Sequence, residues 1–482
     1  MVKAVPRPGP LNAEGGYRFA LGLAVLSTVA IFLWGLGSIP LMSLNEARRA
    51  VPLQEMVASG DWLLPTLNGQ LYIVKPPLLY WLTTSLAWVS GSTGEWVVRL
   101  PSAVAALTTA WAVFATARHS FGRWPALFAL LVLVANAGIA SFGRRGEIEM
   151  LLTALCTGAL LAVFRYLFTG GSRVWLLGSY GLLGLAVLTK GPVALLFVIP
   201  PLLVYTLIAR DRRALTALVY PWGWLLLVVV GSSWYLAVVA KLGLEPWRSV
   251  VAVDIVGKVS SDSGSPAYTY LIWVLGDFLP WSILLLTLRR TVTCWLGTAE
   301  GKFLACAVWL PFLVLSLFDE KHAKYLLPAY PALALLLGVR ASDFYHRVGA
   351  RWKSWLLAGS LAMLVSYVGY FGFVEARFYQ YRFEALPRIA AYLDRYPRVS
   401  VRAFPKADMR AVYYHGAPIP VLTIEEAKAG LTTGEPVLLL VRRKMAERFL
   451  GQGWCELAAF APYLGRDKEA VILGAGPLCT QD

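Results

Sequence analysis

Long apolar runs recur through the first 375 residues of the chain, and they limit its possible folds more than any other feature. A helix that crosses a bilayer needs about 20 mostly apolar residues. The run at 17–40 is too long for the apolar part of a signal peptide and has no small-residue cleavage site, so it predicts a retained helix. About eleven membrane helices are predicted in all: 17–40, 96–117, 124–142, 150–168, 175–189, 191–209, 216–240, 268–288, 303–318, 325–340 and 354–373.

Composition supports a membrane protein. Hydrophobic residues make up 58% of the 482 residues and charged residues 15%, whereas an average soluble domain has about 25% charged residues. These values exclude an intrinsically disordered chain, a coiled coil and a typical cytosolic enzyme. The five cysteines include no CxxC pair, which argues against a zinc cluster.

The net charge of +16 is best explained by topology. With a cytoplasmic N-terminus, alternate loops are rich in arginine and lysine and poor in acids, which is the positive-inside pattern. We therefore predict no nucleic-acid partner. The basic residues of these loops are Arg118, Arg123, Arg165, Arg173, Arg210, Arg212, Arg213, Arg289, Arg290, Lys302, Arg340, Arg347, Arg351 and Lys353.

The opposite, outer loops mix acids with bases around 45–75, 144–149, 245–262 and 319–324. Orientation does not require these acids, and ionisable groups close to the membrane usually have a function. The structural alternative is that they are solvated loop tips and snorkelling helix ends.

The chain beyond residue 375 changes character. Short apolar runs alternate with helical stretches, which predicts a small α/β domain at 375–482 after a membrane domain at 1–374. With an odd number of spans this domain lies outside the cytoplasm. Cys455 and Cys479 both fall in it and could pair in an oxidising compartment, although the sequence alone does not show that they meet.

The first outer loop, residues 41–90, is too long for a simple turn. A helical piece begins near Asn45, and Asn68-Gly69 predicts a tight turn. The apolar run from Leu78 is too short to span a bilayer, so we interpret it as an interfacial or re-entrant helix.

The motifs of this loop and of the later spans resemble one family as a set. They are NEARRA (45–50), GDWLLPTLNGQLYIVKPPLLYWL (60–82), RLPSAVAALTTAWAVF (99–114), RRGEIEMLLTAL (144–155), GLAVLTKGPVALL (184–196), YLIWVLGDFLPWSILLL (270–286) and KYLLPAYPALALLLG (324–338). In order and spacing they resemble the bacterial polyprenyl-phosphate-sugar glycosyltransferases of the GT-C superfamily, in the branch of the aminoarabinose–lipid A transferases and protein O-mannosyltransferases. The resemblance implies a GT-C fold for the membrane region.

The resemblance also implies an activity. A sugar would pass from a polyprenyl-phosphate donor to a lipid, glycan or protein acceptor, with inversion, at the periplasmic face of the bacterial inner membrane. Such a transfer needs a base for the acceptor hydroxyl, groups that stabilise the departing phosphate, and a cavity for the lipid. The sequence has no Walker A or Rossmann motif, which fits a lipid-linked donor.

Two glutamates are candidates for the base. The family has an Asp-Glu pair where this chain has Asn45 and Glu46, and an amide cannot act as a base. We predict Glu46 as the substitute base, with Asn45 orienting the acceptor. Glu149, which matches a second family carboxylate, is the alternative base, and Glu147 is close in sequence. The structural alternative is that Glu46 caps a helix or pairs with Arg48 or Arg49.

Lys75 is the first candidate for binding the lipid phosphate, because it matches the family lysine that does so and two prolines fix the backbone after it. The alternative is a lysine that snorkels to the interface. The further candidates for phosphate contacts are Tyr325, Lys324, Lys258, Arg48, Arg144 and Lys190.

We predict no required metal or other cofactor. Some aminoarabinose transferases bind zinc through a glutamate and a histidine, and the glutamate position is Val74 in this chain. His322 is the only histidine of the outer loops in the membrane region, and a lone histidine does not make a zinc site.

Three other functions compete with transfer from a polyprenyl phosphate. An oligosaccharide ligase uses a diphosphate donor and would need more cations around its leaving group. A transporter or flippase for a lipid-linked sugar would have charges near mid-span or two matching halves, and neither is evident. A non-catalytic scaffold with this fold stays open because of Asn45.

Overall fold

The computed structural model describes residues 12–250, 264–266, 268–286, 288–378, 385–429, 435–450, 452–461 and 469–479. The chain divides into two compact units. The first comprises residues 1–34, 102–144 and 148–371, and the second comprises 35–101, 145–147 and 372–482. The second unit thus joins the first loop to the C-terminal tail. The predicted domain boundary at 374/375 stays a prediction.

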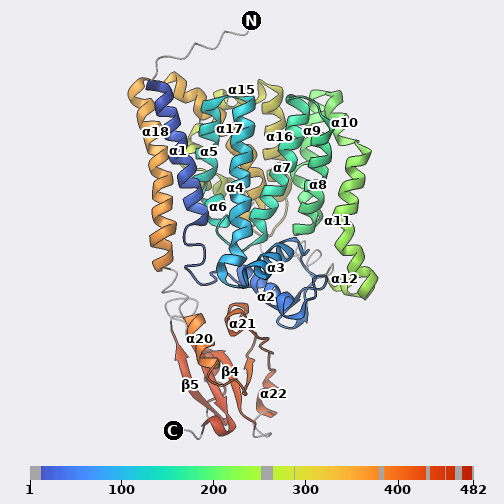
Figure 1. Ribbon diagram of the computed structural model, residues 1–482, viewed down its shortest axis with the longest axis vertical. Helices are drawn as coiled ribbons and strands as arrows, with labels where there is room; N and C mark the ends of the chain where they lie inside the picture. The colour runs from blue at the N-terminus through green and yellow to red at the C-terminus, as the bar shows by residue number, and fades with distance from the viewer. Residues whose placement is uncertain are drawn as a thin grey trace. The chain divides into compact units, whose positions relative to one another are not determined.

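The first unit is helical, and its long helices run alongside one another in Figure 1. Contacting pairs include α7 with α8, α8 with α11, α5 with α17, and α1 with α18. The elements are α1 (Asn12–Leu33), most of α4 (Glu95–Ser120), α5 (Arg123–Val134), α6 (Ala137–Phe142), α7 (Ile148–Phe168), α8 (Arg173–Lys190), η1 (Pro192–Phe197), α9 (Ile199–Ala209), α10 (Arg212–Leu218), α11 (Pro221–Leu242), α12 (Glu245–Val250), α14 (Thr269–Asp277), η3 (Trp281–Leu286), α15 (Leu288–Leu296), α16 (Ala299–Ser316), η4 (Ala323–Ala329), α17 (Tyr330–Arg347), α18 (Ala350–Gly369) and the start of η5 (Tyr370–Val374).

The chain is a multi-pass membrane protein. Within the described residues, eight helical segments are long and apolar enough to cross a bilayer, and Arg123–Val134 is a shorter apolar helix. The predicted run at 124–142 is interrupted at Asn136, whose side chain accepts a hydrogen bond from Ile139 N and caps α6. The run at 268–288 contains the short helices α14 and η3. The number of spans, predicted as about eleven, stays a prediction.

Small residues allow close helix packing in the first unit. A Cβ atom on Gly184 of α8 would lie 2.8 Å from the Cβ of Val230 on α11. A Cβ on Gly223 of α11 would lie 2.4 Å from the Tyr180 ring on α8. Because lipid supplies no hydrophobic drive for helix association, such van der Waals contacts stabilise this pair of helices.

In the second unit, the first loop contains α2 (Leu44–Ser59), a hairpin of β1 (Thr66–Leu67) and β2 (Gln70–Leu71), and α3 (Leu78–Ser90). Ser43 caps α2 by accepting a hydrogen bond from Glu46 N, and Gly60 ends it in the left-handed conformation. The predicted turn at Asn68-Gly69 is confirmed, since both residues have positive φ, 57° and 75°. That turn closes the β1–β2 hairpin.

The predicted α/β tail is confirmed. Its sheet has the order β3-β4-β6-β5, with β3 parallel to β4 and the other pairs antiparallel. Strand β4 is buried on both faces, because Leu438 and Leu440 pack into one core and Leu439 and Val441 into the other. The elements are α20 (Ala385–Leu393), β3 (Ser400–Ala403), α21 (Met409–His415), α22 (Ile424–Ala429), β4 (Val437–Arg442), α23 (Arg443–Ala446), β5 (Trp454–Phe460), β6 (Ala470–Ala475) and η6 (Gly476–Cys479).

Cys455 and Cys479 form a disulfide across 24 residues of sequence, with their Cα atoms 5.5 Å apart. The bond ties β5 to the segment that follows β6. Replacing both cysteines with serine is expected to destabilise the tail by about 3 kcal/mol, because a loop of this length gains that much unfolded-state entropy. Denaturant unfolding followed by tryptophan fluorescence measures the loss. Adding a reductant to the wild type should reproduce it, and an unchanged midpoint in both cases would contradict the expectation.

Candidate active site

Three charged side chains meet in the first unit: Glu149, Lys190 and Lys324. The Oε1 atom of Glu149 lies 3.4 Å from the Nζ atom of Lys190 and 3.2 Å from that of Lys324. All three side chains are largely buried, with exposed fractions of 5%, 15% and 17%. We call these residues, together with Tyr325, the lysine cluster.

Helix geometry explains why these residues meet. Residues 169–172 connect α7 and α8, so the hairpin brings the start of α7 beside the end of α8. Glu149 lies in the first turn of α7 and Lys190 in the last turn of α8. Each charge complements the dipole of its own helix. Lys324 comes from η4, which packs against α7.

Tyr325 completes the lysine cluster. The Lys190 ammonium lies 4.8 Å from the centre of the Tyr325 ring, within the range of a cation–π interaction. The cluster therefore contains two cations and one carboxylate in a partly buried place. Ammonium groups donate strong hydrogen bonds to phosphate oxygens, so the two lysines are suited to bind a phosphate.

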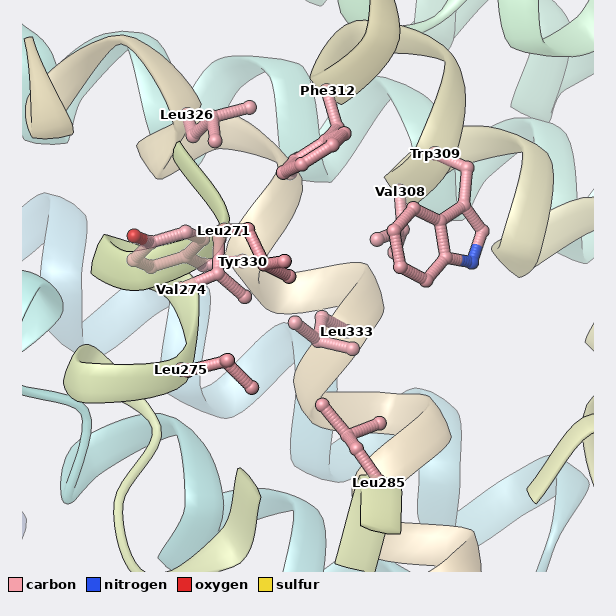
Figure 2. Close-up of a pocket in the computed structure, with 11 residues that line it drawn as sticks. Leu271, Val274, Leu275, Leu285, Val308, Trp309, Phe312, Leu326, Tyr330 and Leu333 are labelled. Atoms are coloured by element: carbon pink, nitrogen blue, oxygen red, sulfur yellow. The ribbon is translucent and has the colours of Figure 1, made fainter. Parts of the chain in front are cut away.

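A pocket lined by aliphatic and aromatic side chains lies between α14, η3, α16, η4 and α17 (Figure 2). The helix η4 that carries Lys324 and Tyr325 continues directly into this lining through Leu326 and Ala329. A polar site and an apolar pocket thus share one short helix. The lining residues are Leu271, Val274, Leu275, Leu285, Val308, Trp309, Phe312, Leu326, Ala329, Tyr330 and Leu333.

Glu46 lies in the second unit and is fully buried. Its Oε1 atom accepts hydrogen bonds from Arg99 Nε at 2.6 Å and Gly146 N at 3.0 Å. Its Oε2 atom accepts from Met42 N at 2.9 Å and Arg99 Nη2 at 3.2 Å. Arg99 uses its remaining hydrogens on the carbonyl oxygens of Leu36, Ile39 and Pro40.

These contacts suit an anchor more than a base. Burial by itself would raise the pKa of the Glu46 carboxyl, but the Arg99 guanidinium and the amides of Gly146 and Met42 together hold it below its ordinary value. A base needs a free lone pair that reaches the acceptor proton. The prediction that Glu46 is the base stays a prediction. Its geometry favours the alternative of an ion pair, with Arg99 as the partner rather than Arg48 or Arg49.

The other predicted site residues of the second unit lie in the first loop. Asn45 is half-buried in the first turn of α2, Arg48 is exposed, and Lys75 is half-buried before α3. Glu147 accepts a hydrogen bond from the Ser43 hydroxyl at 3.0 Å. Lys258 lies outside the described residues.

Arg144 and His322, in the first unit, have local partners. Arg144 donates to the carbonyl oxygen of Ile31 and stacks over the Phe371 ring. His322 lies 3.0 Å from a Glu320 carboxylate oxygen. In the described part of the chain, no group of three or more His, Cys, Asp or Glu side chains has the arrangement of a metal site.

Sequence reasoning missed Arg99. It lies inside the predicted span 96–117, and an arginine within a span is itself a signal, because a buried charge needs a partner. The signal does not identify the partner. Glu46 is 53 residues away, and only the fold brings the two side chains together.

Sequence comparison identifies relatives of the membrane region. Residues 74–239 match the family described as dolichyl-phosphate-mannose-protein mannosyltransferase. The chain is 29% identical over 67% of its length to the undecaprenyl phosphate-alpha-4-amino-4-deoxy-L-arabinose arabinosyl transferase of Edwardsiella ictaluri, and 28% identical over 70% to that of Pectobacterium atrosepticum. The matches span 59% and 63% of those two relatives.

Solved structures show the same fold. ArnT from Cupriavidus metallidurans in the apo state superposes with a TM-score of 0.80 over 97% of this chain and all of that one, at 20% identity. The same protein bound to undecaprenyl phosphate gives 0.79 over 96% of this chain and all of that one, also at 20% identity. The chain therefore has the GT-C fold of these structures, and its membrane region is similar in sequence to the aminoarabinose transferases and to the dolichyl-phosphate-mannose-protein mannosyltransferase family.

Proposed function

We propose that the protein transfers a sugar from a polyprenyl phosphate to a hydroxyl or similar group of a lipid, glycan or protein acceptor, with inversion. The observation that carries the proposal is the lysine cluster, which places two ammonium groups on and beside the short helix that also lines an apolar pocket. A polyprenyl-phosphate sugar has the matching parts: a phosphodiester with one negative charge and a long apolar tail. The names of the two relatives and the bound lipid of the ArnT structure support this donor class.

In the proposed reaction, the acceptor oxygen attacks the anomeric carbon while Glu149 takes its proton. The bond between that carbon and the phosphate oxygen breaks, and its electron pair leaves with the polyprenyl phosphate. The departing phosphate gains a second negative charge, and Lys190 and Lys324 stabilise that charge in the transition state. Tyr325 is a further proposed phosphate contact in the first unit, whereas for Lys75, Lys258 and Arg48 a phosphate contact stays a prediction from the sequence.

The ion pairs of Glu149 give the proposed donor a second role. Both lysines contact the Glu149 carboxylate in the structure, so they occupy part of its hydrogen-bonding capacity. A phosphate that draws the lysines away would remove these two contacts from the Glu149 Oε1 atom. Donor binding would then favour the role of Glu149 as the base.

The proposed location is the bacterial inner membrane, with a cytoplasmic N-terminus and a periplasmic tail. Basic residues concentrate in the loops on the N-terminal side, which supports this orientation. The disulfide between Cys455 and Cys479 supports an oxidising compartment for the tail.

The test is turnover by the purified protein in lipid vesicles. Polyprenyl-phosphate sugars and an envelope extract are added, and the release of free polyprenyl phosphate is measured. Release that requires the extract supports transfer. No release from any donor, by protein that melts cooperatively, would overturn the proposal and favour a non-catalytic scaffold. Movement of the donor across vesicles without release would indicate a flippase.

Removing one cluster lysine should weaken donor binding. We expect Lys190→Ala and Lys324→Ala each to raise the Kd for polyprenyl phosphate about 10- to 100-fold, the effect of one lost charged hydrogen bond. Binding of a fluorescent polyprenyl phosphate to the detergent-solubilised protein measures this. Lys353→Ala is the matched control, because its ammonium lies over the Tyr345 ring in another part of the first unit. Equal affinity in all variants would contradict the assignment of the phosphate site.

A further inference from the structure

We infer that the C-terminal tail is a positioning element for the proposed reaction: its helix α21 clamps the first loop and fixes the start of α2, where Asn45 lies. All contacts that support this inference lie within the second unit. The inference rests on the proposed function for its effect on turnover. The clamp itself can be tested without activity.

The first part of the clamp is Tyr414. Its hydroxyl accepts a hydrogen bond from Leu41 N at 2.9 Å and donates one to Glu95 Oε1 at 2.8 Å. One side chain of the tail thus joins the two ends of the first loop, just before α2 and at the start of α4. The neighbouring Tyr413 donates from its hydroxyl to the Thr93 carbonyl oxygen at 2.8 Å.

The second part of the clamp is at the hairpin. The Asn68 amide donates to the Ile419 carbonyl oxygen at 2.9 Å and accepts from Ile419 N at 2.7 Å. This paired hydrogen bond satisfies both backbone groups of Ile419, which is fully buried. Gln54 of α2 also donates to the Tyr413 carbonyl oxygen at 3.1 Å.

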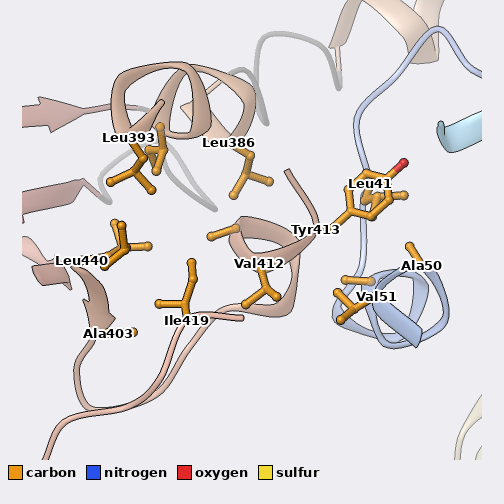
Figure 3. Packing of buried hydrophobic residues seen from close by; sticks show 14 of the residues in the cluster. Leu41, Ala50, Val51, Leu386, Leu393, Ala403, Val412, Tyr413, Ile419 and Leu440 are labelled. Atoms are coloured by element: carbon orange, nitrogen blue, oxygen red, sulfur yellow. The ribbon is translucent and has the colours of Figure 1, made fainter. Parts of the chain in front are cut away.

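Apolar contacts also join the first loop to α21. One continuous core contains Leu41, Ala50 and Val51 of the first loop together with Val412 and Tyr413 of α21. Figure 3 shows the Tyr413 ring beside Leu41, with Val51 of α2 facing α21. The same core continues to Leu386 and Leu440 of the tail. The loop and the tail therefore share one hydrophobic core.

Two consecutive backbone amides, those of Leu41 and Met42, connect the clamp to the first turn of α2, where Asn45 lies. Leu41 N is held by Tyr414, and Met42 N is held by Glu46 in the first turn of α2. Asn45, the proposed acceptor-orienting residue, directly precedes Glu46. The donor phosphate, by contrast, is assigned mainly to the lysine cluster of the first unit. Loosening the clamp should therefore impair the acceptor-dependent step and leave donor affinity intact.

The experiment compares four variants of the full chain in lipid vesicles. Tyr414→Phe and Asn68→Ala each remove one part of the clamp. Glu95→Gln keeps an oxygen that can accept from Tyr414. Tyr392→Phe removes a tail hydroxyl whose described partners, the Leu457 carbonyl oxygen and Tyr396, both lie in the tail. Hydrogen exchange of residues 41–47, donor Kd and acceptor-dependent kcat are measured for each.

We expect Tyr414→Phe and Asn68→Ala to speed exchange at 41–47 and lower kcat by about tenfold, with donor Kd within about twofold of the wild type. Glu95→Gln and Tyr392→Phe should match the wild type. Unchanged exchange, faster exchange with normal turnover, or a loss of donor binding parallel to turnover would overturn the inference. If the wild type has no turnover, the proposed function fails, and exchange alone decides whether the clamp exists.

Discussion

Replacing Glu149 with glutamine is expected to lower turnover about 10³-fold, because a positioned general base contributes 10²- to 10⁴-fold. Glutamine has nearly the same shape but cannot take a proton. Donor binding should persist or improve, since Lys190 and Lys324 lose the carboxylate that competes with phosphate. The measurements are release of polyprenyl phosphate under saturating donor and the Kd for polyprenyl phosphate.

The matched control for Glu149 is Glu320→Gln. Glu320 is also a loop-proximal carboxylate with a basic partner, His322, but it lies outside the lysine cluster. Its variant should keep normal turnover. Wild-type turnover by Glu149→Gln would contradict the proposed base and return attention to Glu46. A parallel loss of donor binding would mean that Glu149 holds the lysines in place rather than accepting a proton.

Replacing Glu46 with glutamine is expected to lower the stability of the fold strongly. Glu46→Gln leaves the Arg99 guanidinium buried without its counter-charge, and breaking a buried ion pair costs about 3–5 kcal/mol. The amide nitrogen of glutamine would also face an N–H group of Met42 or Gly146, which are both donors. We expect a strongly lowered melting temperature, measured by differential scanning fluorimetry in detergent. Arg48→Gln, which removes an exposed charge two residues away on α2, is the control.

The pH dependence of this effect follows from the lowered pKa of Glu46. Because the folded pKa lies below the unfolded value of about 4.3, the ionised carboxylate stabilises the fold above that pH. The stabilisation is lost as the pH falls through the folded pKa. The gap in melting temperature between wild type and Glu46→Gln should therefore be constant near neutrality and shrink in acid. If Glu46→Gln melts like the wild type but has no turnover, Glu46 is the base after all.

Patterns that act over short distances were predictable from the sequence. The apolar runs gave the helical membrane region, and Asn68-Gly69 gave the hairpin turn. Alternating apolar runs after residue 375 gave the α/β tail. Each of these features depends on residues within a single helix, strand or turn. The spacing of apolar residues along that segment indicates its structure.

Pairings across long stretches of sequence were not predictable. The partner of Glu46 is Arg99, and the partners of Glu149 come from two other helices. Residues 409–415, which form α21, have no strong apolar period, and their contacts with the first loop depend on the sheet that holds them. The sequence favoured Glu46 as the base, with Glu149 as the alternative. In the structure, Glu46 accepts from Arg99 and from two backbone amides, whereas Glu149 lies beside the ammonium groups of Lys190 and Lys324.

The order of strands in the tail has a consequence for biosynthesis. Strand β6 lies between β4 and β5 in the sheet but follows both of them in the sequence. The ribosome therefore translates this inner strand after both of its neighbours. The first loop also forms its contacts late. Tyr414, whose hydroxyl accepts a hydrogen bond from Leu41 N, is translated 373 residues after Leu41. During translation the early helices can enter the bilayer while this loop has no partner. A ribosome-bound chain that stops before β6 should therefore expose the first loop to protease, and maturation of the loop should follow membrane insertion rather than accompany it.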